Sequence, residues 1–223
     1  IGPGVNHTLD KIADSLGKGL EKVDISSEFI GLLERPRYGF GANMNPCIDC
    51  KILMFTKAKE LMKDFGASFI VTGEVLGQRP MSQHRQALEL IEKKSGLEGL
   101  LLRPLSAKLL SETLPEKEGW VNREELLNFG GRTRRPQIEL AAKLNIKDYQ
   151  NPAVGCLLTD PQFSNRLKDL IRHSPLSLEN IELLKLGRHF RLTGRAKLVV
   201  GRNEKEDNRL LDLARGGDYL FIP

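Results

Sequence analysis

Apolar residues follow two patterns along the chain. Up to about residue 103, segments with helical spacing alternate with short apolar or alternating runs. The spacing predicts helices over residues 8–17, 26–33, 48–65 and 82–94. Short runs predict strands over residues 20–25, 67–72 and 99–103.

This alternation, with short connections, is typical of an α/β fold in which a parallel sheet carries helices on both faces. Ligands of such sheets bind beyond the carboxyl ends of the strands. Thr72-Gly73-Glu74 lies at the carboxyl end of one predicted strand, and Arg103-Pro104-Leu105 lies at the end of the next. We expect a binding site where these two segments meet.

Beyond residue 105 the pattern becomes mostly helical. Helices are predicted near residues 106–113, 122–128, 135–145, 161–173, 177–186 and 203–215. The helix over 161–173 has the clearest start, because Pro161 suits a first helical turn and Asp160 precedes it as a cap. Strands are expected over 189–192, 197–201 and 218–222, so that residues 166–223 form a small α+β unit.

Composition places the chain among ordinary globular proteins. Of its 223 residues, 40% are hydrophobic and 28% are charged, and no apolar run approaches the roughly 20 residues of a membrane span. The first residues lack a basic stretch followed by an apolar core, which excludes a secretory signal there. Three cysteines, an odd number, favour a reducing, cytoplasmic location over a disulfide framework.

Basic residues are unevenly distributed. The net charge is +5 and the sequence pI is near 9.1, which hints at a polyanionic partner. Arg132, Arg134 and Arg135 cluster in G-G-R-T-R-R-P, and further Lys and Arg residues crowd residues 185–202. These segments are either RNA-binding surfaces or solvated faces.

The cysteine pattern suggests sulfur or metal chemistry. Cys47 and Cys50 lie in N-M-N-P-C-I-D-C-K at a predicted helix start, where the helix dipole favours the thiolate form. This pair has three interpretations: a redox dithiol, half of a metal site, or a nucleophile with a helper. Cys156 is distant and precedes another helix start. Three thiols without a clear fourth ligand are typical of an iron–sulfur cluster with one open iron, although Cys156 could instead be a small buried residue.

Three motifs resemble the PP-loop ATP-pyrophosphatases that thiolate tRNA, the 4-thiouridine synthases and tRNA 2-thiouridylases. T-G-E-V-L-G-Q-R-P-M-S-Q is similar to the T-G-E-x-L-G-Q…S-Q segment of the former, with one extra residue before Ser82. N-P-C-I-D-C-K and G-C-L-L-T-D-P-Q-F resemble the two cysteine segments of the latter. The motifs occur in the family's order over residues 43 to about 165, so the resemblance implies a PP-loop domain over residues 1–165.

The resemblance implies ATP-dependent thiolation of a tRNA uridine. The uridine would be adenylated by ATP, with Mg²⁺, and then attacked by cluster-bound sulfide or a cysteine persulfide. Sulfide or a cysteine desulfurase would supply the sulfur. The implied catalytic residues are Cys50 and Cys156, with Cys47 added as a third ligand of a [4Fe-4S] cluster. The implied nucleotide-binding residues are Gly73, Gln78, Gln83 and Lys51.

One family feature is missing from the sequence. The phosphate-gripping S-G-G-x-D-S loop does not occur, and the chain opens at what resembles the family's second helix. We therefore expect an N-terminally truncated domain. The rival hypothesis is a non-catalytic RNA-binding protein whose thiols hold a structural metal or iron–sulfur site. A faint likeness of K-L-V-V-G-R-N-E-K-E-D-N-R-L to NFACT-type RNA-binding modules fits either hypothesis.

Overall fold

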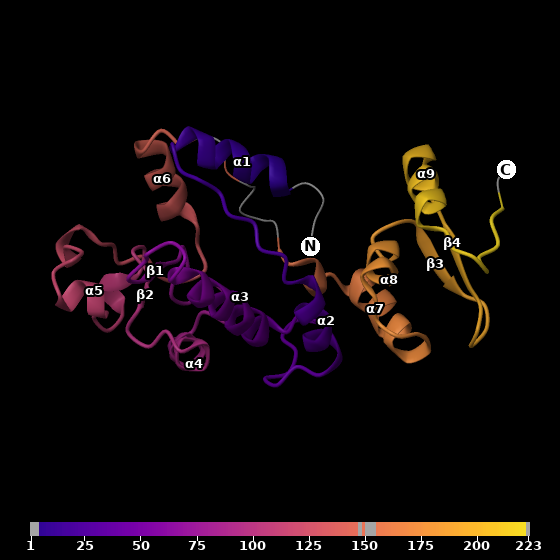
Figure 1. Ribbon diagram of the computed structural model, residues 1–223, viewed down its shortest axis with the longest axis horizontal. Coiled ribbons are helices and arrows are strands. Elements are labelled where there is room, and N and C mark those ends of the chain that lie inside the picture. Colours follow the sequence, from indigo (N-terminus) through magenta and orange to yellow (C-terminus); the bar gives the residue numbers. More distant parts are fainter. Residues whose placement is uncertain (1–4, 147–148, 150–154, 222–223) are drawn as a thin grey trace. The chain divides into compact units, whose positions relative to one another are not determined.

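The computed structural model describes residues 5–146, 149 and 155–221 (Figure 1). The chain divides into two compact units, which are described separately. The first contains Ile1–Ile25 and Pro46–Gly155, and the second contains Ser26–Asn45 and Cys156–Pro223. The second unit thus includes a stretch that interrupts the first in sequence.

The first unit is a mixed α/β structure. Its elements are α1 (Val5–Ser15), α3 (Cys47–Met62), β1 (Ile70–Val71), α4 (Arg85–Ser95), β2 (Leu101–Leu102), α5 (Leu114–Lys117) and α6 (Arg135–Lys143). Two short 3₁₀ segments, η1 (Ala107–Leu109) and η2 (Arg123–Glu125), follow β2 and α5. Strands β1 and β2 pair in parallel, with Ile70 opposite Leu101 and Val71 opposite Leu102.

Apolar side chains cover both faces of this small sheet. Leu101 packs on one face with Phe55 of α3 and Ile91 of α4. Leu102 packs on the other face with Ala107 and Leu126, which belong to or adjoin the 3₁₀ segments. The alternation of side chains along a strand explains why neighbouring residues enter separate cores.

Helices α3 and α4 run in the same direction. Cys47, at the start of α3, contacts Ser82 just before α4, and Lys59 near the end of α3 reaches Gly96 at the end of α4. Both N-termini therefore lie on the side of the strand ends at Thr72 and Arg103, and both C-termini lie on the opposite side.

The second unit packs short helices with a β-hairpin. Its elements are α2 (Ser26–Glu34), η3 (Leu157–Thr159), α7 (Pro161–His173), α8 (Leu178–Leu183), β3 (Arg188–Arg191), β4 (Lys197–Val200) and α9 (Glu204–Leu213). Strands β3 and β4 are antiparallel, with Phe190 opposite Leu198. Helix α7 buries Phe163, Leu167 and Leu170 at helical spacing.

The structure corrects several predicted elements. Residues 20–25 form no strand, and Leu20 and Val23 are exposed at 40% and 45%. In the predicted last strand, residues 218–221 are irregular and the side chains of Tyr219 and Phe221 are almost fully exposed. Neither segment has a paired strand within the described residues, and a strand without a hydrogen-bonded neighbour is not stable.

Other predictions were right in type but not in length. The strands expected over 67–72 and 99–103 shrink to two residues each, and the helices expected over 106–113 and 122–128 are single 3₁₀ turns. The parallel sheet therefore has two strands in the described part of the chain instead of three or more. No helix in that part is long and apolar enough to cross a membrane.

Candidate functional site

The loop that follows β1 is held in a compact turn. Thr72 continues the strand pairing by donating its N–H to the Leu102 carbonyl at 2.9 Å. Gly77 then donates to the Gln83 carbonyl at 2.7 Å, which closes residues 77–83 into a ring. Gly77 has a φ of 77° and packs near the backbone of Gly131, so that only glycine fits there without strain.

Two further segments anchor this loop. The Ser106 hydroxyl accepts the Leu76 N–H at 2.9 Å and donates to the Phe129 carbonyl at 2.7 Å. Leu76 also forms a parallel bridge with Gly130, and its carbonyl accepts the Gly131 N–H at 2.8 Å. The basic segment that begins at Arg132 therefore starts beside this loop.

A chain of charged side chains lies beneath the loop. Glu74 and Arg103 are each 3% exposed, and Arg103 Nε donates to Glu74 Oε2 at 3.1 Å. Arg103 Nη1 also pairs with Glu92 of α4. On the other side, Lys51 Nζ lies 3.3 Å from Glu74 Oε1, and the Lys51 side chain is 22% exposed. Two positive and two negative groups thus alternate, which compensates the burial of each charge.

The N-terminus of α3 brings the cysteine pair to the same place. The Cys47 thiol donates to the Ser82 hydroxyl at 2.9 Å, and Ser82 is fully buried. Cys50 is half-buried, with its sulfur 4.0 Å from the Met54 sulfur. Both thiols lie in the first turn of α3, at the positive end of the helix dipole.

Several buried polar atoms around the loop have no hydrogen-bond partner among the described residues. They include Gln78 Nε2, Gln83 Oε1 and Arg103 Nη2. Buried polar groups are nearly always paired, and leaving one unpaired costs about 1–3 kcal/mol. Three such atoms around one loop are available to ordered water or to a polar ligand.

The structure brings together most of the predicted site residues. Lys51, Gly73, Gln78 and Gln83 all belong to or adjoin the loop that contacts Cys47. Gly73 is exposed, and a Cβ there would meet no atom within 4 Å. Neither φ nor protein packing demands a glycine at this position, which leaves its backbone open to a ligand.

The remaining predicted residues have different surroundings. Arg132 is exposed, Arg134 is half-buried, and Arg135 pairs with Glu139 of α6 at 2.8 Å. Cys156 is exposed and belongs to the second unit, in a stretch whose preceding residues 150–154 lie outside the described part. Among the described residues, no group of three His, Cys, Asp or Glu side chains could hold a metal ion. The three-thiolate cluster therefore remains a prediction.

The pairing of Glu74 with Arg103 was not predicted. The sequence indicated only that the two residues lie at the ends of neighbouring strands. The sequence places Ser82 in the T-G-E-V-L-G-Q-R-P-M-S-Q motif but does not predict its contact with Cys47. The signal that could have found the ion pair is an acidic residue and a basic residue at adjacent carboxyl ends of a parallel sheet.

A second charged cluster lies in the other unit. Arg191 and Lys197 both contact Asp169 of α7, at 2.7 and 3.3 Å. The hydrogen bond from Arg191 lowers the pKa of Asp169 to about 2, and Lys197 contributes in the same direction. Burial lowers the pKa of the neighbouring His189 to about 4, and the nearby charges of Lys197 and Arg166 add to this. This cluster ties the hairpin to α7.

Comparison with known proteins gives no relative. No protein-family model, curated protein or solved structure matches the chain.

Proposed function

We propose that this chain is part of an ATP-dependent tRNA sulfurtransferase with a PP-loop-like domain. The observation that carries the proposal is the convergence of the cysteine segment, the T-G-E-V-L-G-Q loop and the basic segment at one end of a parallel sheet. Cys47 contacts Ser82, Lys51 contacts Glu74, and Gly130 bridges Leu76. The first two of these segments are among the three that resemble tRNA-thiolating enzymes, and the third resembling segment, around Cys156, belongs to the second unit.

The site contains groups suited to a nucleotide. The amide of Gln78, the amide oxygen of Gln83 and the free guanidinium nitrogen of Arg103 supply both donors and acceptors, as a nucleotide requires. The open backbone at Gly73 allows close approach. Lys51 is held by Glu74 with part of its side chain exposed, from where its ammonium group can reach a phosphate.

The proposed reaction exchanges one uridine oxygen for sulfur. Attack of the uridine carbonyl oxygen on the α-phosphate of ATP forms an O–P bond and releases diphosphate. A sulfur nucleophile then forms a C–S bond at the same carbon, and AMP leaves with the oxygen. Cys47 and Cys50, both in the first turn of α3, supply the thiols that such chemistry needs. The base must leave its stack to reach the loop, and Arg132 and Arg134 would hold adjacent phosphates.

Thiolation of bulk tRNA tests the proposal. The protein encoded by the complete reading frame is incubated anaerobically with tRNA, ATP, Mg²⁺ and sulfide, and thiolated tRNA is detected by its retardation in a mercury-containing gel. We expect ATP-dependent retardation that is lost in Cys50→Ser and retained in a surface variant such as Lys117→Gln. Activity without ATP, or full activity of Cys50→Ser, contradicts the proposal.

Iron content separates the two sulfur carriers. A [4Fe-4S] cluster predicts an anaerobically purified protein that is brown, with iron lost in each of Cys47→Ser, Cys50→Ser and Cys156→Ser. A colourless, active protein would instead favour the persulfide route. A protein that binds metal and RNA but never thiolates would support the non-catalytic RNA-binding alternative.

A further inference from the structure

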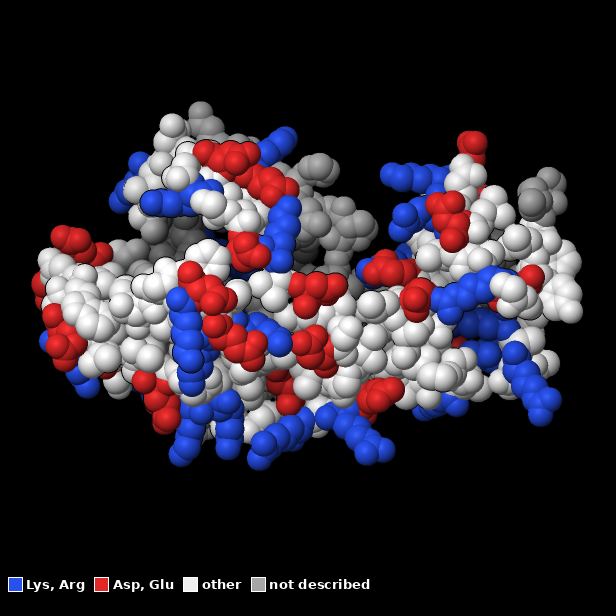
Figure 2. Space-filling model, in the orientation of Figure 1, with Lys and Arg blue, Asp and Glu red and all other residues white. Residues whose placement is uncertain are grey.

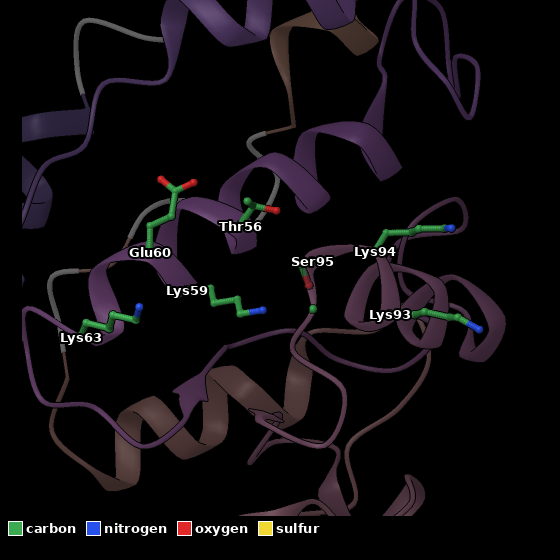
Figure 3. Close-up of a pocket in the computed structure, with 8 residues that line it drawn as sticks. Thr56, Lys59, Glu60, Lys63, Lys93, Lys94 and Ser95 are labelled. Atoms are coloured by element: carbon green, nitrogen blue, oxygen red, sulfur yellow. The ribbon is translucent and has the colours of Figure 1, made fainter.

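A lysine-rich hollow lies at the other end of α3 and α4. It has a volume of about 610 Å³ and is lined by Thr56, Lys59, Glu60, Lys63, Lys93, Lys94, Ser95 and Gly96. We call it the lysine hollow. Figure 3 shows that Lys59, Glu60 and Lys63 come from the end of α3, and Lys93, Lys94 and Ser95 from the end of α4.

The charges of the hollow are not balanced. Lys59, Lys63, Lys93 and Lys94 are exposed, and no carboxylate pairs with them in the described part of the chain. Glu60 pairs instead with Lys57 at 3.3 Å, and in Figure 3 its carboxylate points away from Lys59.

Helix dipoles do not cancel this charge. The C-termini of α3 and α4 both lie at the hollow, and each carries about half a negative charge. Lys59 lies directly at the C-terminus of α4 and offsets its negative charge. Its ammonium group occupies the space that a Cβ at Gly96 would need. Four ammonium groups against Glu60 and two helix ends leave a net charge of about +2. Figure 2 shows Lys and Arg side chains gathered along the edge of the molecule beside α4.

The lining also indicates the kind of partner. It contains no apolar or aromatic side chain, so it offers nothing to the hydrophobic anchor of a peptide or a membrane surface. It also has no Arg, Asn or Gln, whose planar groups make the bidentate contacts to base edges. Lysine ammonium groups are compact point charges that suit phosphate oxygens. These properties fit the backbone of a nucleic acid, bound without regard to sequence.

We infer that the lysine hollow binds the phosphate backbone of the RNA whose base enters the proposed site. Lys59 and Lys63 lie 12 and 16 residues beyond Cys47 on α3 and its C-cap, which is about 18–24 Å along the helix axis. One RNA helix spans that distance with several nucleotides. The α3–α4 pair would therefore present a base-handling end and a backbone-holding end to one molecule. The identity of the RNA rests on the proposed function, but the binding itself does not.

Equilibrium binding of bulk tRNA tests this inference with the full chain, in the absence of ATP and any sulfur donor. Lys93→Gln/Lys94→Gln removes two charges of the hollow and leaves Lys59 on the end of α4. The matched control is Lys18→Gln/Lys117→Gln, which removes two exposed lysines elsewhere in the same unit. Affinity is measured by fluorescence anisotropy over a series of salt concentrations, and thermal melting verifies that each variant is folded.

We expect the hollow variant to bind tRNA at least fivefold more weakly at low salt and the control to change less than twofold. The slope of log K against log salt should become shallower by about two in the hollow variant. Equal losses in both variants would show that only net charge matters and would overturn the inference. The hollow variant is also tested with phosphatidylserine vesicles and with polyglutamate. If it loses binding to either of these as strongly as it loses binding to tRNA, the hollow belongs to another class of partner. Because the assay omits ATP and sulfur, a failed thiolation assay and a failed hollow are distinguishable.

Discussion

At the scale of single residues, the buried charges beside the loop are the most demanding feature of the first unit. Glu74 lies between Lys51 and Arg103, and Arg103 also forms a salt bridge with Glu92. Burying such groups is costly unless each charge keeps its partner. Arg103 holds two carboxylates at once, so its side chain controls both the loop and its attachment to α4.

Removal of Arg103 should destabilise the first unit severely. Arg103→Leu leaves Glu74 and Glu92 without their shared cation, and we expect the free energy of unfolding to fall by about 3–5 kcal/mol. Urea unfolding can be followed by fluorescence of Trp120, the one tryptophan of the sequence, whose ring lies 6.2 Å from that of Phe69. Arg135→Leu, which removes the exposed pair with Glu139, is the control and should cost less than about 0.5 kcal/mol. Similar losses in the two variants would mean that the buried network contributes little.

His189 should make the second unit sensitive to mild acid. Burial lowers its pKa to about 4, its Nε2–H donates to the Leu186 carbonyl at 2.8 Å, and Nδ1 is buried without a partner among the described residues. The unfolded chain, with a pKa near 6.5, therefore takes up the proton first. The contribution of His189 to stability is complete above pH 6.5 and is lost as the pH falls towards 4, and it amounts to no more than about 3 kcal/mol.

Imidazole carbon–proton NMR signals followed against pH give the measurement, and His189→Gln assigns the signal. A midpoint near 6.5 for His189 would contradict a buried neutral imidazole. Asp169 acts in a separate window, because its lowered pKa makes its contribution disappear only as the pH falls from 3.8 towards 2.

At the scale of elements, the sequence predicted helices far better than strands. The helix expected over 161–173 is α7 with the same bounds, because Asp160, Pro161 and the spacing of Phe163 and Leu167 all specify it locally. A strand depends on a partner that its own residues do not encode. Residues 20–25 alternate and residues 219–221 form an apolar run, yet neither segment forms a ladder in the described structure.

The cap of α7 is a direct test of this local control. Asp160 accepts the Phe163 N–H at 2.7 Å, so Asp160→Ala should lower stability by about 1 kcal/mol. Hydrogen exchange of the first-turn amides of α7 should accelerate in this variant and remain slow in Asp160→Asn, which keeps a capping oxygen. Unchanged exchange in Asp160→Ala would show that packing alone defines the helix start.

At the scale of the whole molecule, the candidate site was predictable only in part. The placement of Thr72–Glu74 beside Arg103 followed from the rule for parallel strands and is confirmed by the Glu74–Arg103 contact. The contact of Cys47 with Ser82 and the bridge of Gly130 to Leu76 join segments far apart in sequence, and no local pattern specifies them. The sequence did not predict the lysine hollow for the same reason. Its lysines form one surface only when the ends of α3 and α4 meet.

Two separate basic surfaces of the first unit should contribute independently to RNA affinity. Figure 1 shows α6, which Arg134 precedes, and α4 on opposite sides of α3. Groups more than about 7–10 Å apart without shared partners have nearly additive effects.

Arg132→Gln/Arg134→Gln and Lys93→Gln/Lys94→Gln should therefore each weaken tRNA binding, and the combined variant should show the product of the two fold-changes. Their reductions in salt slope should likewise add, because each surface releases its own counterions. The same anisotropy titrations provide the measurement. If the combined variant binds tRNA no more weakly than the weaker of the two double variants, the two surfaces do not contribute independently to RNA binding.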